Sequence, residues 1–188
     1  MQAGLGRSTA TPARSSRAGF GILELLIALS VMLLGLSGLV SVLLENIALG
    51  EQARNMAIAV QAARSRLEQL QGADLSTTFA SFNDFAGDDP AGAPGPGFAV
   101  PGLDPDPADG DGMTGDIAFP VAAGGPGTLS ETDPAFPGMP RDLNLDGDAV
   151  DADVTADFGM LPVVIRLRWR ASSGAIQRYE VCTILFGP

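Results

Sequence analysis

The chain has 188 residues, of which 22 are acidic and 11 basic, with no histidine and one cysteine, and its formal net charge at pH 7 is −11. This composition excludes histidine-based catalysis, metal sites built from histidine or cysteine, and a disulfide within the chain. The negative charge argues against nucleic acid as a partner. No nucleophile–base pair or nucleotide fingerprint is present, so we predict that the protein is not an enzyme.

The first 19 residues carry three arginines and no acidic residue, and an almost uninterrupted apolar run follows them. Residues 25–44 contain only three serines as polar residues. At about 1.5 Å per residue this stretch spans roughly the 30 Å hydrocarbon layer of a membrane. We therefore predict a basic leader at 1–19, which suits cytoplasmic retention, and a transmembrane segment at about 22–44.

Glu24 is a carboxylate inside the apolar run. An ionised side chain costs roughly 2.5 to 3.5 kcal/mol at mid-bilayer, so Glu24 is a functional candidate that needs a partner. A cut after Gly19 would create an amine on Phe20, about one helical turn from Glu24. Pairing between staggered subunits would favour one axial register. The alternative is a glutamate that snorkels to the interface at the end of an ordinary anchor helix.

The order Arg17-Ala18-Gly19-Phe20-Gly21-Ile22-Leu23-Glu24, followed by an apolar helix, resembles the processing and methylation motif of type IV prepilins and type II secretion pseudopilins. The resemblance implies that a prepilin peptidase cuts after Gly19 and methylates Phe20, and that Glu24 is the assembly glutamate. It further implies a single-pass protein of the inner (cytoplasmic) membrane with a periplasmic or extracellular C-terminal domain. Such a protein joins other pilin or pseudopilin subunits in a filament. Gly21 departs from the family pattern, in which a hydroxyl residue is commoner.

The apolar pattern continues past the membrane segment as one helical stripe. Its members recur at spacings of four and three residues: Leu49, Ala53, Met56, Val60, Ala63, Leu67 and Leu70. No proline occurs between Phe20 and Gly72, so we predict one helix over 20–71 whose second half covers a soluble domain. A free coiled coil is the alternative interpretation of the stripe.

The remainder divides into an acidic region at 72–161 and a C-terminal hairpin at 162–188. The region is rich in Gly, Pro, Asp and Ala, which predicts loops, short edge strands and partly disordered linker. In the hairpin, Val163, Ile165, Leu167 and Trp169 alternate with Val164 and three arginines, as in a strand with one buried face. We expect an α+β fold in which the long helix packs on a small antiparallel sheet.

We make two further predictions about the hairpin, one for its arginines and one for its cysteine. We expect the arginine row to face solvent or acidic loop residues, with the acidic surface of a neighbouring subunit as the alternative. We expect Cys182, within the second strand, to be a small buried apolar residue.

Residues 142–153 have the spacing of a calcium loop, with oxygen ligands at positions one, three and five, glycine at six and a carboxylate at twelve. The predicted ligands are Asp142, Asn144, Asp146, the Asp148 carbonyl and Asp153. The resemblance to secretion pseudopilins, which use calcium in a distal loop, favours the same assignment. The alternative is an acidic loop that is simply solvated.

Together these patterns predict a prepilin-like structural subunit of a type IV pilus or type II secretion pseudopilus, and a minor subunit rather than the bulk one. The alternative is a membrane-anchored or secreted calcium-binding interaction module whose leader is cut by signal peptidase, since Ala48-Leu49-Gly50 is a passable small-x-small site.

Overall fold

The computed structural model describes residues 21–122, 125 and 127–187, so the predicted leader and the Gly19–Phe20 junction lie outside the described residues. The chain divides after Glu45 into two compact units. One continuous helix, α1 (Ile22–Gln71), contributes to both units and ends directly before Gly72. The predicted α+β fold is confirmed.

In the first unit, every residue of α1 up to Glu45 is exposed, and this part of the helix is long and apolar enough to cross a membrane. Its three serine hydroxyls hydrogen-bond to backbone carbonyls of the same helix: Ser30 to Leu26, Ser37 to Leu34, and Ser41 to Ser37, at 2.8 to 3.1 Å. These hydroxyls are satisfied within the helix, as a lipid environment requires.

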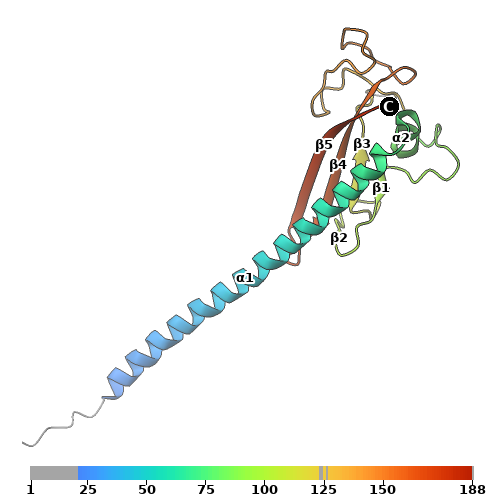
Figure 1. Cartoon of the computed structure of the whole chain (residues 1–188). Helices are drawn as coiled ribbons and strands as arrows, with labels where there is room; N and C mark the ends of the chain where they lie inside the picture. The colour runs from blue at the N-terminus through green and yellow to red at the C-terminus, as the bar shows by residue number, and fades with distance from the viewer. Residues whose placement is uncertain (1–20, 123–124, 126, 188) are drawn as a thin grey trace, which may run out of the picture. The chain divides into compact units, whose positions relative to one another are not determined.

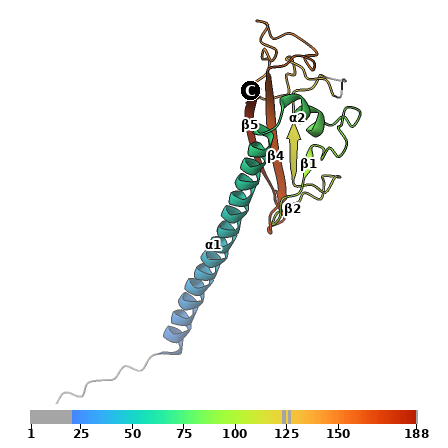
Figure 2. The same ribbon diagram turned by 45° about the vertical axis from the view of Figure 1, so that its right-hand side comes forward.

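The second unit holds a short helix and five antiparallel strands (Figure 1). The elements are α2 (Leu75–Phe82), β1 (Gly97–Phe98), β2 (Asp104–Pro105), β3 (Gly115–Ala118), β4 (Met160–Arg170) and β5 (Ile176–Phe186). On one edge β4 pairs with β3 and β2, and on the other it pairs with β5 along the whole length of both strands. Figure 2 shows the same order, with β5 on the outside of the sheet.

The core lies between one face of β4 and the second half of α1. On this face Leu161, Val163, Ile165, Leu167 and Trp169 are all fully buried, as the alternation predicts. The most buried α1 side chains are Ala59, Ala63 and Leu70, with Met56, Ile58, Ala62 and Leu67 packed at the margin. The predicted stripe therefore holds from Met56 onward, but Leu49 and Ala53 are exposed and Ala59 takes the place expected for Val60.

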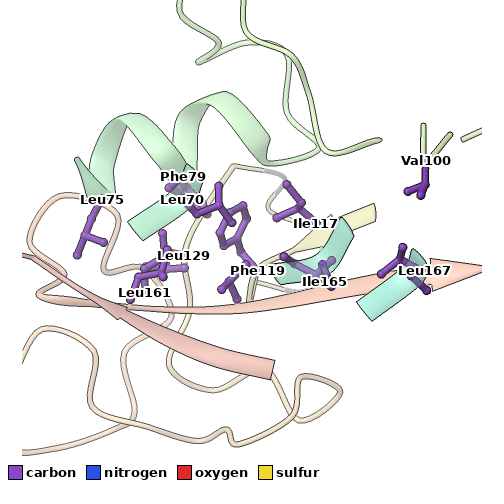
Figure 3. Packing of buried hydrophobic residues seen from close by; sticks show 14 of the residues in the cluster. Leu70, Leu75, Phe79, Val100, Ile117, Phe119, Leu129, Leu161, Ile165 and Leu167 are labelled. Atoms are coloured by element: carbon purple, nitrogen blue, oxygen red, sulfur yellow. The ribbon is translucent and has the colours of Figure 1, made fainter. Parts of the chain in front are cut away.

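Residues 72–161 contribute much of this core, and the predicted loops and short strands are found in them. Phe79 of α2 meets Phe119 edge to face, with ring centroids 5.4 Å apart, and Ile117 and Leu129 pack beside them (Figure 3). The helix α2 was not expected. Asp74 caps it by accepting hydrogen bonds from the backbone of Ser76 and Thr77, which compensates for its weak helix formers.

The opposite face of β4 is polar toward the end of the strand. The Arg168 guanidinium lies 2.6 Å from the buried Asp106 carboxylate and 3.5 Å from Asp109, and Arg166 lies 3.8 Å from Asp116. The expectation that the arginine row faces acidic loop residues is confirmed for Arg168, whereas the acidic partners of Arg166 lie on the neighbouring strands: Asp116 on β3 and Glu180 on β5. Burial raises the pKa of Asp116, an effect that Arg166 partly offsets.

Cys182 is exposed on this outer face, so the prediction that it is buried is wrong. The residue pairs with Val164 across the two strands and therefore points away from α1. The alternation of β5 is not strongly amphipathic in sequence, which is why the face of Cys182 could not be assigned from the pattern.

We predict that Arg168→Ala lowers the free energy of unfolding by about 2 kcal/mol, because the Asp106 carboxylate, 2% exposed, loses its cation. The value lies below that of a fully buried pair because 38% of the Arg168 side chain is exposed. Urea unfolding of the full chain in detergent micelles measures the change.

Arg170→Ala is the matched control, since Arg170 lies on the same strand face, is exposed and forms no ion pair with a described residue. It should change stability by less than about 0.5 kcal/mol. Equal losses in the two variants would show that the Arg168–Asp106 pair contributes nothing specific.

Candidate functional site

The loop predicted to bind a cation begins with a tight turn built around Asp142. The Asp142 carboxylate accepts hydrogen bonds from the backbone N–H groups of Leu145 at 2.6 Å and Gly147 at 2.9 Å. Gly147 has a φ of 108° and Leu145 a φ of 67°. Two residues in the left-handed region curl the backbone sharply, and the glycine at position six serves the purpose predicted for it.

The turn continues through a series of side chain to backbone hydrogen bonds. Asn144 accepts from the N–H of Asp146, Asp146 from that of Asp148, and Asp148 from that of Val150, each at 3.1 to 3.2 Å. This pattern is typical of aspartate-rich and asparagine-rich turns, in which side chains satisfy their own backbone. No helix flanks the loop.

Glu131 ties the two ends of the loop together. Its carboxylate accepts hydrogen bonds from the N–H groups of Leu143 at 2.6 Å, Asn144 at 3.4 Å and Asp151 at 3.3 Å. The backbone of Glu131 also bonds to Asp151 and Arg141. The side chain is 0% exposed and has no basic partner among the described residues. A buried carboxylate with backbone donors only is stabilised by a nearby cation.

Glu131, Asp148 and Asp151 form a cluster, here called the acidic cluster, whose carboxylate oxygens lie within 4.8 Å of one another. Glu131 is buried, Asp151 half-buried and Asp148 exposed. Three carboxylates at this separation, open to solvent on one side, could hold a metal ion. Oxygen donors of this kind suit hard divalent cations.

The pKa values of Asp151 and Asp153, the two carboxylates that follow Val150, are shifted in opposite directions. Partial burial, together with Asp146, Asp148 and Glu131, raises the pKa of Asp151. Hydrogen bonds from Thr155 lower the pKa of Asp153. The Asp151 carboxylate therefore lacks compensating positive charge, whereas that of Asp153 is satisfied locally.

The structure brings together a different set of residues from the one expected. Of the predicted ligands only Asp148 belongs to the acidic cluster, and it does so through its side chain rather than its carbonyl. Asn144 reaches the cluster through a 3.4 Å hydrogen bond to Asp151. Asp142, Asp146 and Asp153 are not members, so their roles as ligands stay predictions.

Glu131 and Asp151 were missed because the spacing rule considers one continuous loop. Asp151 falls at position ten, which has no side-chain ligand in that rule, and Glu131 lies 11 residues before the loop begins. The one available signal is that Glu131 is the single glutamate among the aspartates of 72–161.

Glu24, the predicted assembly residue, lies in the first turn of α1. Its backbone N–H bonds to the Gly21 carbonyl at 3.1 Å, and its carboxylate forms no ion pair with a described residue. The predicted cleavage and methylation residues, Gly19 and Phe20, lie outside the described residues.

Comparisons with protein-family models, with curated proteins and with solved structures found no match.

We predict that Asp151→Asn weakens binding of a divalent cation by at least about tenfold, whereas Asp153→Asn changes it by less than about twofold. The acidic cluster includes Asp151 but not Asp153, whereas the continuous-loop assignment includes Asp153 but not Asp151. Calorimetric titration of the full chain in detergent with Ca²⁺ and with Mg²⁺ measures the affinities. The reverse order of effects would restore the loop assignment.

Asp157→Asn is the matched control, because Asp157 is exposed, lies in the same segment and is not a member of the cluster. Absence of cation binding by the wild-type chain would remove the acidic cluster as a metal site.

Proposed function

We propose that this chain is a prepilin-like structural subunit that is processed by a prepilin peptidase and assembled through its N-terminal helix into a type IV pilus or type II secretion pseudopilus. The observation that carries the proposal is the order of Gly19, Phe20 and Glu24 directly before and within the start of α1. The peptidase would cut after Gly19 and methylate Phe20. The chain is then a substrate of processing rather than a catalyst.

The exposed apolar surface of α1 supports this proposal. Among its large side chains, those from Ile22 to Leu44 are roughly half to four-fifths exposed. A surface of this size on a soluble chain marks contact with lipid or with another protein. It would face the inner membrane before assembly and other subunits after it.

Two glycines would favour close packing of this surface. Gly35 and Gly38 have no neighbouring atom within 4 Å of the place where a Cβ would lie. Small residues on an apolar helix let the backbones of neighbouring helices approach closely. The same helix can therefore serve first as an anchor and then as the packing element of a filament.

Glu24 would select the register of assembly. Its neighbours Leu23, Leu25 and Leu26 are apolar, so on burial the carboxylate needs a cation. The methylated amine of Phe20 on an adjacent subunit would supply it. A wrong register leaves two buried charges unpaired, which commonly costs about 3 to 5 kcal/mol.

The second unit would be the periplasmic or extracellular head, and we assign it to a minor subunit because of its extended acidic loops. We propose calcium as the ion of the acidic cluster, since Glu131, Asp148 and Asp151 offer only oxygen donors. The ion would neutralise these carboxylates and brace the loop. A chain with one cysteine cannot brace it with an internal disulfide.

The competing function, an interaction module released by signal peptidase, is less well supported. Its cut site, Ala48-Leu49-Gly50, lies inside the continuous helix α1. A cut there would also separate the membrane segment from the part of α1 that covers the sheet.

We predict that the mature protein begins with N-methyl-phenylalanine at Phe20, as measured by mass spectrometry of the purified chain. A mature chain that begins at Met1 or at Glu51 would contradict the proposal, because neither leaves an amine beside Glu24.

We predict further that Glu24→Ala is inserted and cut like the wild type but is at least about tenfold depleted from sheared filaments, because its register is no longer selected. Glu45→Ala is the matched control, being an exposed glutamate in the same half of α1, and should be incorporated normally. Normal incorporation of Glu24→Ala would remove Glu24 from the mechanism.

A further inference from the structure

The strand β5 leaves one of its two edges without a partner in the described part of the chain. The strand order is β1-β3-β4-β2 with β5 on the other side of β4, so β5 pairs with β4 alone. The pairing runs without a bulge from Ile176 to Phe186. Long, regular and open edges are unusual, because natural proteins shorten, twist or cover them.

The hydrogen-bond pattern identifies which residues face the open edge. The N–H of Ala171 bonds to Ala175 and that of Gly187 to Gly159, which are opposite residues in the register of β4 and β5. Hydrogen-bonded pairs alternate along an antiparallel ladder, so the odd-numbered residues of β5 bond to β4. The backbone groups of the even-numbered residues point outward: Ile176, Arg178, Glu180, Cys182, Ile184 and Phe186.

The two halves of this edge differ in charge. Arg178 and Glu180 are the only charged residues of β5, and both lie in its first half. The second half, from Val181 to Phe186, carries no charge, and Phe186 is 67% exposed. Charged side chains discourage pairing at an edge, so the second half is the part that is open to a new strand.

A cavity of about 460 Å³ lies beside the same half of β5. Its lining includes Phe136, Pro162, Cys182, Ile184 and Phe186, and Arg141 is the only charged side chain in it. The even-numbered β5 residues that offer free backbone groups also line the cavity. A strand added to β5 would place alternate side chains on this face.

We propose that the second half of β5 binds an extended segment of another protein by strand addition. The segment carries one large apolar side chain, which enters the cavity, and a carboxylate next to it, which pairs with Arg141. Backbone hydrogen bonds to Cys182, Ile184 and Phe186 supply affinity, and the cavity with Arg141 supplies specificity, as in other cases of strand addition. Arg141 forms no ion pair with a described residue, so it is open to such a partner.

A second copy of this chain fits the edge poorly. The opposite end of the sheet is β1, which has two residues and is too short to extend β5 of a neighbour. Parallel pairing of two β5 strands would bring Arg178 near Arg178 and Glu180 near Glu180, which is destabilising.

Antiparallel pairing of two β5 strands requires a two-fold axis perpendicular to them. The second half of α1 runs along the sheet in both views (Figures 1 and 2), so this axis would reverse one α1 relative to the other. Two chains anchored in one membrane cannot adopt that arrangement. Only this exclusion of antiparallel pairing depends on the membrane anchoring that is part of the proposed function.

The test uses a fluorescent synthetic peptide of about ten residues in which threonine and valine alternate, with a central phenylalanine and a glutamate two residues later. A second peptide has lysine in place of the glutamate. Fluorescence anisotropy measures their binding to the full chain in detergent micelles, which requires neither processing nor filament assembly. We expect the glutamate peptide to bind at least about tenfold more tightly than the lysine peptide.

Two substitutions at Cys182 test the edge itself. Cys182→Pro removes an outward N–H without removing a hydrogen bond to β4, and should weaken binding of the glutamate peptide at least about tenfold. Cys182→Ala keeps the N–H and should change binding less than about twofold. Equal binding by the two variants, or binding of neither peptide by the wild type, would overturn the proposal.

Arg141→Glu keeps the test decisive if the proline variant fails to fold. This variant should prefer the lysine peptide over the glutamate peptide, and a misfolded chain cannot reverse a preference. An unchanged preference would overturn the role of Arg141. A Cys182–Cys182 cross-link in membranes that the peptide prevents would overturn the choice of partner and assign the edge to a second copy.

Discussion

The packing of the second half of α1 on the core face of β4 is the interaction on which the second unit depends. Ala59 and Ala63 are almost completely buried there, against a face formed by Leu161, Val163, Ile165 and their neighbours. The larger Leu70, at the end of α1, belongs to the same buried cluster. Substituting larger residues at the two alanines would force the layers apart, because a packed core has little free volume.

With the helix placed on the sheet, the acidic region of 72–161 can fold around the rest of β4. It supplies β1, β2 and β3, the helix α2, and aromatic residues such as Phe79 and Phe119. Six of its carboxylates form two groups. Asp106, Asp109 and Asp116 meet arginines of β4, whereas Glu131, Asp148 and Asp151 meet one another. The first group pairs with basic side chains of the sheet, and the second could hold a metal ion.

Regular elements with a strong period could be predicted from the sequence. The α1 stripe from Met56 to Leu70 and the alternation from Leu161 to Trp169 are strong because each buries one face against the other. The helix α2 was missed because its serines and threonines are weak helix formers, and the Asp74 cap decides its conformation. The face of Cys182 was misjudged because β5 has apolar residues on both faces.

The acidic cluster could be predicted only in part. The spacing after Asp142 correctly indicated a sharp turn, since the side chains of the turn bond to their own backbone. The place of Glu131 depends on tertiary structure, because the segment that contains it runs beside residues 151–155 through hydrogen bonds between residues distant in sequence. A spacing rule for one continuous loop cannot identify a ligand that belongs to another segment of the chain.

Glu24 and Glu131 present the same physical problem in two environments. Each is a carboxylate without a basic partner among the described residues, Glu24 in an apolar helix and Glu131 in a buried loop junction. A carboxylate in a medium of low polarity is stabilised by a nearby positive charge, and the described residues supply none at either place. In our proposals this charge is the amine of an adjacent subunit for Glu24 and a metal ion for Glu131. Under these proposals the cost of burying each carboxylate makes a partner necessary. A subunit that finds both partners would then be in the correct register along α1 and correctly folded in its second unit.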